Sequence, residues 1–222
     1  MEERLRAQWQ AAIRDGHAPE AVAPRPQQVE DALDRLLARH REPHRRYHTV
    51  THVAAALDTA EDLLAQVDGA DGAAVRLALC FHDAIYDPQA AAGANESASA
   101  ALAERELAEL GLGAGCAAAA SAAIMATADH RLPPDRSPTT AVVLDADLAI
   151  LAAEPARYEA YVTGVRAEYA HVDDEGWRTG RAAVLAAFLD RPVIFVTAPM
   201  RASEHRARAN LAAELSRLRA GA

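Results

Sequence analysis

Two histidines in the stretch RRYHTVTHV, residues 45–53, have a spacing that can do chemistry. His48 and His52 are four residues apart, and on a helix this spacing places both imidazoles on one face, with about 6 Å between their Cβ atoms. Imidazole is a common ligand of divalent transition metals. An HxxxH pair alone is more often an ordinary polar edge, and Thr49 stands where an HExxH metalloprotease has its general base. The pair therefore needs partners from elsewhere in the chain.

Two further segments carry polar side chains where the pattern predicts burial. His82 and Asp83 directly follow the apolar run ALCF, and Asp145 and Asp147 interrupt the run VVLDADLAIL. A helix cap or a helix-dipole contact would explain each segment alone. A buried carboxylate is costly, however, unless it is paired or bound to a cation. The coincidence of the three segments predicts a mixed imidazole and carboxylate site, formed by His52, His82, Asp83 and Asp147, for one or two divalent ions (Mn, Fe, Co, Ni, Zn or Mg).

The elements that must position these residues are helices. Apolar side chains recur with the helical period at about residues 26–41, 45–67, 72–84, 96–110, 115–130, 138–151, 155–172, 174–191 and 199–219. The segment at 72–84 is apolar almost all round, which is typical of a central helix. Residues 192–197, PVIFVT, have the composition of a strand, but one strand cannot make a sheet. We expect an all-α fold, a compact helical bundle of one domain over residues 1–222, with its core at about 27–190 and the helix at about 199–219 packed on it.

Composition excludes several classes of function. The net charge of −9 and the pI of about 5.5 argue against sequence-independent binding to nucleic acid, which depends on clustered positive charge. No apolar run reaches the roughly 18 residues of a membrane span, and the N-terminus lacks the apolar core of a signal peptide. Two widely separated cysteines favour a reducing compartment. We expect a cytoplasmic protein with no membrane partner, and monomer and homodimer both stay open.

The ordered series of these motifs resembles a known superfamily. The pattern H…HD…D, in the wider context FHDAIYD, NESAS, ATADH and DADLAIL, is similar to the HD superfamily of metal-dependent phosphohydrolases. Within it, the chain looks most like a bacterial group of predicted metal-dependent phosphohydrolases of about this length. The likeness covers roughly Trp9 to Glu214, and a more distant one connects the chain to the catalytic domain of cyclic-nucleotide phosphodiesterases. It implies an HD-type helical fold.

The resemblance also implies roles for individual residues. The matched metal ligands are His52, His82, Asp83 and Asp147. Asp83 would bridge two ions, and His48 would protonate the leaving oxygen. Asp147 is favoured over Asp145 as the ligand because it precedes Leu148, as in the ADL motif of the phosphodiesterases.

The implied reaction is hydrolysis of a phosphoester in a small metabolite such as a nucleotide, by metal-activated hydroxide with a histidine as general acid. A phosphate substrate needs cations, and every basic residue of the chain is Arg; Arg46, Arg166 and Arg181 are the candidates. Two alternatives stay open. One is a di-iron oxygenase, because some HD proteins hold a di-iron pair and oxidise their substrates. The other is a regulator that keeps the fold and binds a nucleotide without catalysis.

Four further residues have a functional and a structural interpretation each. Asp87 would share a face with Asp83 if the helix continued to Tyr86, and could then orient a ligand histidine. Glu96 either favours a helix N-terminus or contributes to a second metal. His130, which ends ATADH, is either a second-metal or phosphate contact or a helix C-terminal cap. Asp145 is the alternative to Asp147.

Overall fold

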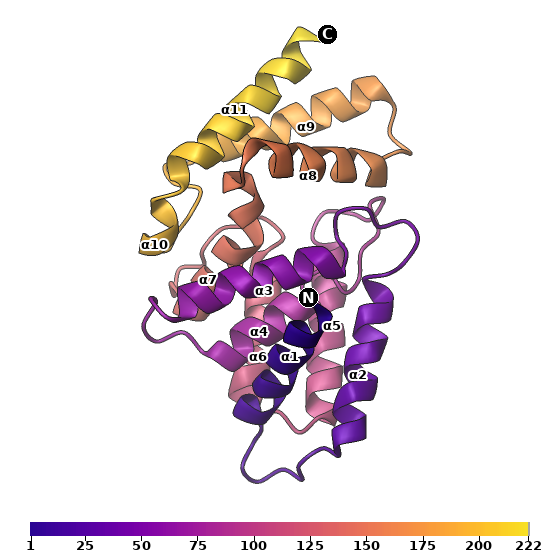
Figure 1. The fold of residues 1–222 in the computed structure, drawn as a ribbon, viewed down its shortest axis with the longest axis vertical. Coiled ribbons are helices and arrows are strands. Elements are labelled where there is room, and N and C mark those ends of the chain that lie inside the picture. Colours follow the sequence, from indigo (N-terminus) through magenta and orange to yellow (C-terminus); the bar gives the residue numbers. More distant parts are fainter. Residues whose placement is uncertain (222) are drawn as a thin grey trace. The chain divides into compact units, whose positions relative to one another are not determined.

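The computed structural model describes residues 1–221. The chain forms two compact units, Met1–Asp147 and Leu148–Ala222. All regular structure within residues 1–221 is helical, and no strand occurs among them (Figure 1). The predicted all-α fold class is therefore confirmed. The prediction of a single domain stays a prediction.

The helices of the first unit are α1 (Glu2–Gly16), α2 (Pro26–Arg39), α3 (Val50–Leu64), α4 (Gly72–Phe81), α5 (Ala94–Glu109), α6 (Ala114–Ala126) and α7 (Pro138–Leu148), whose last residue belongs to the second unit. α4 lies at the centre and packs against α1, α3, α5 and α6. Its side chains are buried on all sides, from Ala73 to Phe81 with the exception of Arg76. The apolar pattern of this segment correctly predicts its central position, because an all-round apolar helix is stable only when protein covers every face.

Helix ends near the candidate site differ from the prediction. α3 begins at Val50 rather than at Arg45, and Thr49 is its N-cap, with extended backbone. α4 ends at Phe81, so residues 82–87 are not helical beyond the cap at His82. The predicted N-cap of α4 is confirmed, because the side chain of Asp71 accepts a hydrogen bond from the backbone N–H of Ala74.

α1 lies outside the predicted helices, because the charged N-terminal residues hide a short apolar stripe. Leu5, Trp9 and Ile13 recur every four residues and are buried. The indole N–H of Trp9 donates to the carbonyl of Val29 at 3.0 Å, which ties α1 to α2. Trp9 therefore stabilises the packing of α1 on α2, because its large apolar ring is buried and its N–H has a hydrogen-bond partner.

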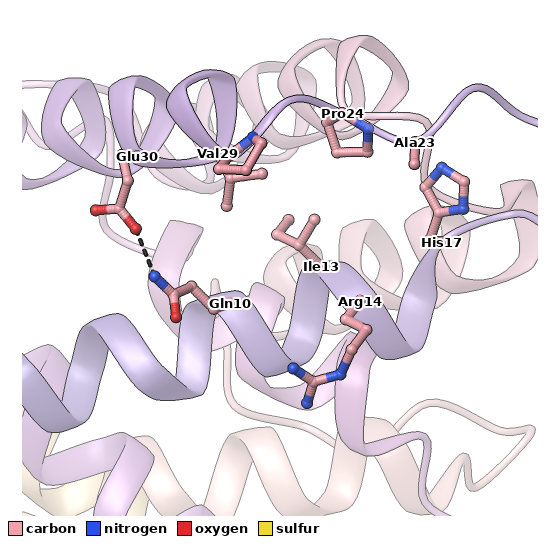
Figure 2. A pocket seen from close by; sticks show the side chains of 9 residues that line it. Gln10, Ile13, Arg14, His17, Ala23, Pro24, Val29 and Glu30 are labelled. Atoms are coloured by element: carbon pink, nitrogen blue, oxygen red, sulfur yellow. Dashed lines mark hydrogen bonds between the residues drawn. The ribbon is translucent and has the colours of Figure 1, made fainter.

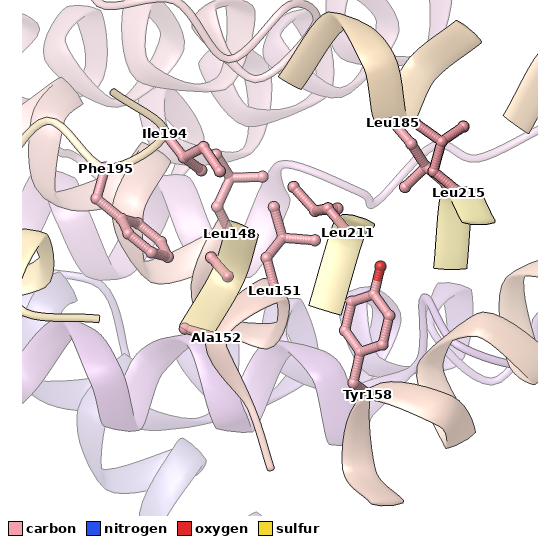
Figure 3. Close-up of a cluster of buried hydrophobic side chains, with 10 residues drawn as sticks. Leu148, Leu151, Ala152, Tyr158, Leu185, Ile194, Phe195, Leu211 and Leu215 are labelled. Carbon is pink, nitrogen blue, oxygen red and sulfur yellow. The ribbon is translucent and has the colours of Figure 1, made fainter. Parts of the chain in front are cut away.

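The second unit contains η1 (Ala149–Ala152), α8 (Pro155–Glu168), α9 (Asp174–Leu189), α10 (Ala198–Arg201) and α11 (Glu204–Ala220). Its apolar core consists of Leu148, Leu151, Ala152, Tyr158, Leu185, Ile194, Phe195, Ala207, Leu211 and Leu215 (Figure 3). The predicted helix at 199–219 is divided between α10 and α11. None of the helices in residues 1–221 combines the length and the apolar character that a bilayer crossing requires.

The strand expected at residues 192–197 is wrong. Ile194 and Phe195 are buried, as their apolar character demands, but they lie in an irregular segment. Their backbone N–H groups donate to the carboxylate of Glu204, at 3.0 and 3.1 Å. Because a side chain at the start of α11 satisfies these N–H groups, the segment needs no neighbouring strand.

Candidate metal centre

Three helices of the first unit bring the four predicted metal ligands together. His52 lies in the first turn of α3, and Asp147 lies near the end of α7. His82 and Asp83 directly follow the last residue of α4. Nε2 of His52 lies 3.1 Å from Nε2 of His82 and 3.0 Å from Oδ1 of Asp147. Oδ2 of Asp83 lies 2.9 Å from Nε2 of His82. We call these four residues the cluster.

The cluster is largely buried. The side chains are 5% exposed for His52, 1% for His82, 19% for Asp83 and 14% for Asp147. Two carboxylates at this depth cost free energy unless positive charge compensates them. The remaining exposure lies on the carboxylates, so a ligand held between these groups would still be reached from solvent.

The distances within the cluster test whether a divalent ion fits. Five separations between the ligand-type atoms of the cluster run from 2.9 to 3.5 Å. Ligand atoms at about 2.1 Å from an ion are about 3.0 Å apart along an octahedral edge and about 3.4 Å apart along a tetrahedral edge. The separations already match these edges. His52, His82 and Asp83 can therefore hold a metal ion, and Asp147 is placed to join them.

A backbone contact sets the proton position on one imidazole. Nδ1 of His82 lies 2.9 Å from the carbonyl oxygen of Leu79, one turn back along α4. A carbonyl accepts only, so Nδ1 carries the proton and, in the neutral ring, Nε2 presents its lone pair to the cluster. A metal-binding histidine usually donates its other ring N–H to a carbonyl or carboxylate in this way, which fixes the tautomer and the orientation of the ring.

Without a cation, protons compensate the two carboxylates. Burial opposes the charged form of His82, but the nearby carboxylates of Asp83 and Asp147 outweigh it and hold the pKa of His82 well above its usual value. Burial likewise opposes ionisation of both aspartates, yet the imidazoles, His82 first among them, hold the pKa of Asp83 and the pKa of Asp147 well below the usual range. The cluster thus favours net positive charge between its carboxylates, which is the electrostatic requirement of a cation site.

His48 lies beside the cluster but not on α3, because the helix begins two residues later. Its ring centroid is 5.8 Å from that of His52, and the two rings meet edge to face. Tyr86 packs against His48 at a centroid distance of 4.3 Å, and Tyr47 does so at 5.0 Å. The predicted helical i,i+4 relation is therefore wrong in its geometry, although the two imidazoles are neighbours as expected.

His130 contacts the cluster through Asp147. Its Nε2 lies 2.8 Å from Oδ2 of Asp147, the carboxylate oxygen that does not face His52. α6 ends at Ala126, and His130 has a left-handed backbone with φ of 50°. A non-glycine residue in this region is strained by about 1–3 kcal/mol, and such strain concentrates at functional sites.

The other candidate carboxylates lie in different surroundings. Asp145 is fully buried in α7, two residues from the aspartate that contacts His52. Asp87 is exposed, and the helical spacing that would place it on the face of Asp83 is absent because α4 has already ended. Glu96 lies in the first turn of α5, where a carboxylate is favoured by the helix dipole.

The three predicted phosphate-binding arginines are placed differently. Arg46 is exposed in the segment before α3 and donates to the carbonyls of Pro43 and Arg45.

Arg166 and Arg181 belong to the second unit. Arg166 donates to the carbonyls of Tyr169 and Val172 and to Asp174, and so closes the end of α8. Arg181 is buried and forms two hydrogen bonds with Glu214, at 2.7 and 3.0 Å. Substrate contact by these arginines stays a prediction.

Side chains of the α2–α3 connection hold the end of α4, which sequence reasoning did not foresee. Nε2 of His40 lies 3.1 Å from the carbonyl of Cys80, and Nε2 of His44 lies 2.9 Å from the carbonyl of Tyr86. Burial lowers the pKa of His40 to about 4, so its ring is neutral near pH 7. Arg45 donates to two further carbonyls of the same segment. In the sequence these residues have no periodic signal, because they lie in an irregular connection.

Two residues of the NESAS motif hold the same segment from its other side. The amide of Asn95 accepts from the backbone N–H of Asp87 and donates to its carbonyl, both at 3.0 Å. The hydroxyl of Ser99 bonds the backbone N–H and carbonyl of Ile85. The i,i+4 spacing of Asn95 and Ser99 is a signal that could have indicated a shared face, but not what that face contacts.

A separate cavity of about 480 Å³ lies between α1, α2 and their connection. Ile13 and Val29 face each other across it, and Gln10 bonds Glu30 at one end (Figure 2). The guanidinium of Arg14 points away from the space (Figure 2). The lining is largely apolar and has no constellation of catalytic groups.

The class that the fold and the site define is an all-α protein with a buried imidazole and carboxylate cluster able to hold a metal ion. Comparisons of the chain with family models, with curated proteins and with solved structures gave no significant match.

Proposed function

We propose that the chain is a metal-dependent phosphohydrolase of the HD type that cleaves a phosphoester of a small metabolite. The observation that carries the proposal is the convergence of four ligand-type side chains from three distant segments, with donor separations of 2.9–3.5 Å. The order and identity of these residues are those of the H…HD…D series. A structural role for the cluster alone would leave two carboxylates buried at a cost.

Each residue of the cluster has a task in such a reaction. A bound divalent ion supplies Lewis-acid activation of water and neutralises charge on the phosphoryl oxygens. His52 and His82 offer Nε2 lone pairs, and the hydrogen bond from His82 to the carbonyl of Leu79 keeps its ring in the required orientation. Asp83 and Asp147 supply the negative charge that makes the site selective for cations.

His48 is the proton donor in this proposal. It lies beside His52, outside α3, with Tyr86 packed on its ring. An imidazole that is close to the ligands but is not needed as one can hold a proton for the leaving oxygen, because histidine titrates near neutral pH. The exposed Arg46 lies two residues away in the chain and offers positive charge for an anionic substrate.

Metal analysis and a phosphoester screen test the proposal. Purified protein is loaded with Mn²⁺, Mg²⁺, Co²⁺ or Ni²⁺ and assayed on nucleotides and other phosphoesters. We expect Asp83→Ala to lose both metal and hydrolysis. We expect His48→Ala to keep the metal and to lose about 10²- to 10⁴-fold in kcat. His171→Ala, an exposed histidine of the second unit, serves as the matched control and should change neither.

Other outcomes would redirect the proposal. Full metal binding by Asp83→Ala would contradict the ligand assignment, and metal binding without hydrolysis of any phosphoester would favour the regulator. The contact between His130 and Asp147 favours a second candidate, because HD-type di-iron oxygenases use histidines beyond the H…HD…D set. Substrate-dependent O₂ consumption by iron-loaded protein would support that candidate instead.

A further inference from the structure

Arg45 is buried next to the cluster, in the connection between α2 and α3. Its side chain is 0% exposed, which is unusual for a residue that is always charged. Nε donates to the carboxylate of Glu42 at 3.1 Å. This ion pair compensates the charge, so the remaining N–H groups of the guanidinium are available for neutral acceptors.

Those N–H groups contact both segments that carry the candidate ligands. Nη1 donates to the carbonyl of His48 at 3.0 Å and to the carbonyl of Asp83 at 2.8 Å. Nη2 donates to the carbonyl of Ala84 at 3.2 Å. One nitrogen atom thus joins the backbone just before α3 to the backbone just after α4.

This bridge lies where α3 begins and where α4 ends. Carbonyls in the irregular backbone after a helix have no intrahelical donor and need other partners when they are buried. Arg45 supplies such donors at Asp83 and Ala84. Because His52 is four residues after His48, holding the carbonyl of His48 also limits the position of the first turn of α3.

We propose that Arg45 is a positioning residue that sets the separation between His48 and His52 on one side and the His82–Asp83 pair on the other, an inference that rests on the proposed metal site. The planar guanidinium has five N–H donors in a rigid fork, so one side chain can hold several carbonyls at fixed distances. A lysine at this position has three donors on a single atom, so it cannot reproduce the fork that also contacts Glu42 through Nε and Ala84 through Nη2.

Metal binding measures this role directly. Co²⁺ titrations followed by visible absorption give both the affinity and the coordination geometry in wild type, Arg45→Ala and Arg45→Lys. We expect Arg45→Ala to bind Co²⁺ about 10- to 100-fold more weakly, with a changed spectrum. Arg45→Lys keeps the charge and most of the volume, and we expect it to fold and to show a smaller loss with an altered spectrum. Arg41→Ala, at an exposed arginine of the same connection that pairs with Glu2, should bind as wild type does.

Chemical rescue separates positioning from a general loss of structure. Guanidinium or methylguanidinium at millimolar concentration should refill the space in Arg45→Ala and restore Co²⁺ affinity and spectrum, without effect on wild type or Arg41→Ala. Wild-type affinity and spectrum in Arg45→Ala, or a loss that guanidinium does not reverse, would overturn the proposal. If Arg45→Ala does not fold, a wild-type Co²⁺ spectrum and affinity in Arg45→Lys overturn it equally.

The same measurements distinguish this inference from the proposed function. Wild-type protein that binds Co²⁺ but hydrolyses no phosphoester contradicts the phosphohydrolase and leaves the Arg45 result intact. An active enzyme whose Arg45→Ala variant binds metal normally contradicts the role of Arg45 alone. In an active enzyme we also expect Arg45→Lys to lower kcat with little change in KM, because the arginine holds the reacting groups and not the substrate.

Discussion

His130 and Asp147 form a contact that divides the two oxygens of one carboxylate between two tasks. Nε2 of His130 lies 2.8 Å from Oδ2, while Oδ1 lies 3.0 Å from Nε2 of His52. A carboxylate held on one oxygen keeps the other aimed at its target. His130 makes this contact from a strained, left-handed backbone with φ of 50°, and such strain is typical of functional sites.

Glycine at position 130 should separate backbone strain from the function of the imidazole. His130→Gly accepts the left-handed conformation without penalty, whereas His130→Ala does not. We expect His130→Gly to be about 1 kcal/mol more stable than His130→Ala. Both should bind metal about 10- to 100-fold more weakly than wild type, because Asp147 loses its support. Thermal unfolding of metal-free protein and metal titration measure the two effects.

Arg136 offers the matched control for this comparison, since it too has a left-handed backbone, with φ of 52°. Arg136→Gly should be about 1 kcal/mol more stable than Arg136→Ala, and both variants should bind metal as wild type does. Wild-type metal affinity in His130→Gly would show that the imidazole does not act on the cluster.

Stability should depend on pH in opposite ways with and without metal. The pKa of His82 in the folded, metal-free protein lies well above 6.5, so its contribution to stability is complete below that value and is lost as pH rises through the folded pKa. Metal binding needs the deprotonated ring and therefore strengthens as pH rises. Above about pH 6.5 we therefore expect the Tm of metal-free protein to fall as pH rises, and the increase in Tm caused by metal to grow.

His82→Gln is the variant that checks this assignment, because it removes the titrating ring. Its metal-free Tm should decline less over the same range. An undiminished decline would assign the effect to other histidines. At acid pH the sign reverses for Asp83 and Asp147: their lowered pKa values stabilise the fold above about pH 3.8, and this contribution is lost as pH falls further.

Asn95 should control the order of the segment after the HD pair. Asn95→Ala removes two hydrogen bonds to the backbone of Asp87, and we expect a loss of about 1–2 kcal/mol in the free energy of unfolding. Hydrogen exchange at the amide of Asp87 should accelerate. Asn95→Asp keeps the acceptor and loses the donor, so its exchange rate should fall between the two. Equal protection in all three proteins would contradict the role of Asn95.

The pair Arg181–Glu214 should behave as a structural ion pair of the second unit. Their side chains are 8% and 2% exposed, and the hydroxyl of Tyr158 also donates to Glu214. Arg181→Met or Glu214→Met alone should cost about 3–5 kcal/mol, because each leaves a buried charge unpaired. The double variant should cost less than the sum of the two, as measured by denaturant unfolding. An Arg181→Met variant that keeps its stability but raises KM would support the predicted phosphate contact instead.

Helix boundaries around the site could not be predicted from the sequence, although the helices could. The continuous apolar character of Ala73–Phe81 indicates a central helix, because such a helix is stable only with protein on every face. The apolar pattern of the sequence does not show that α4 ends at Phe81 or that α3 begins only at Val50. Those limits coincide with hydrogen bonds from Arg45, which is 38 residues from Asp83 in the chain. Local propensity contains no information about such a partner.

The choice between Asp145 and Asp147 as the metal ligand also depends on the tertiary structure. Residues two apart on a helix point about 200° away from each other, so one face of α7 can present only one of them to the cluster. The sequence favours Asp147 only through its likeness to the ADL motif. In the folded chain it is Asp147 whose carboxylate lies 3.0 Å from His52.

The sequence by itself determined the helical class, the central position of α4 and the imidazole and carboxylate side chains available as ligands, because periodicity and residue chemistry are local properties. Only the tertiary structure decided that His52, His82, Asp83 and Asp147 share one cluster, that His130 supports it and that Arg45 joins its two halves. These relations connect residues far apart in the chain, through irregular backbone and side-chain contacts to carbonyls. They exist only after the helices have packed, since packing alone sets the distances between segments.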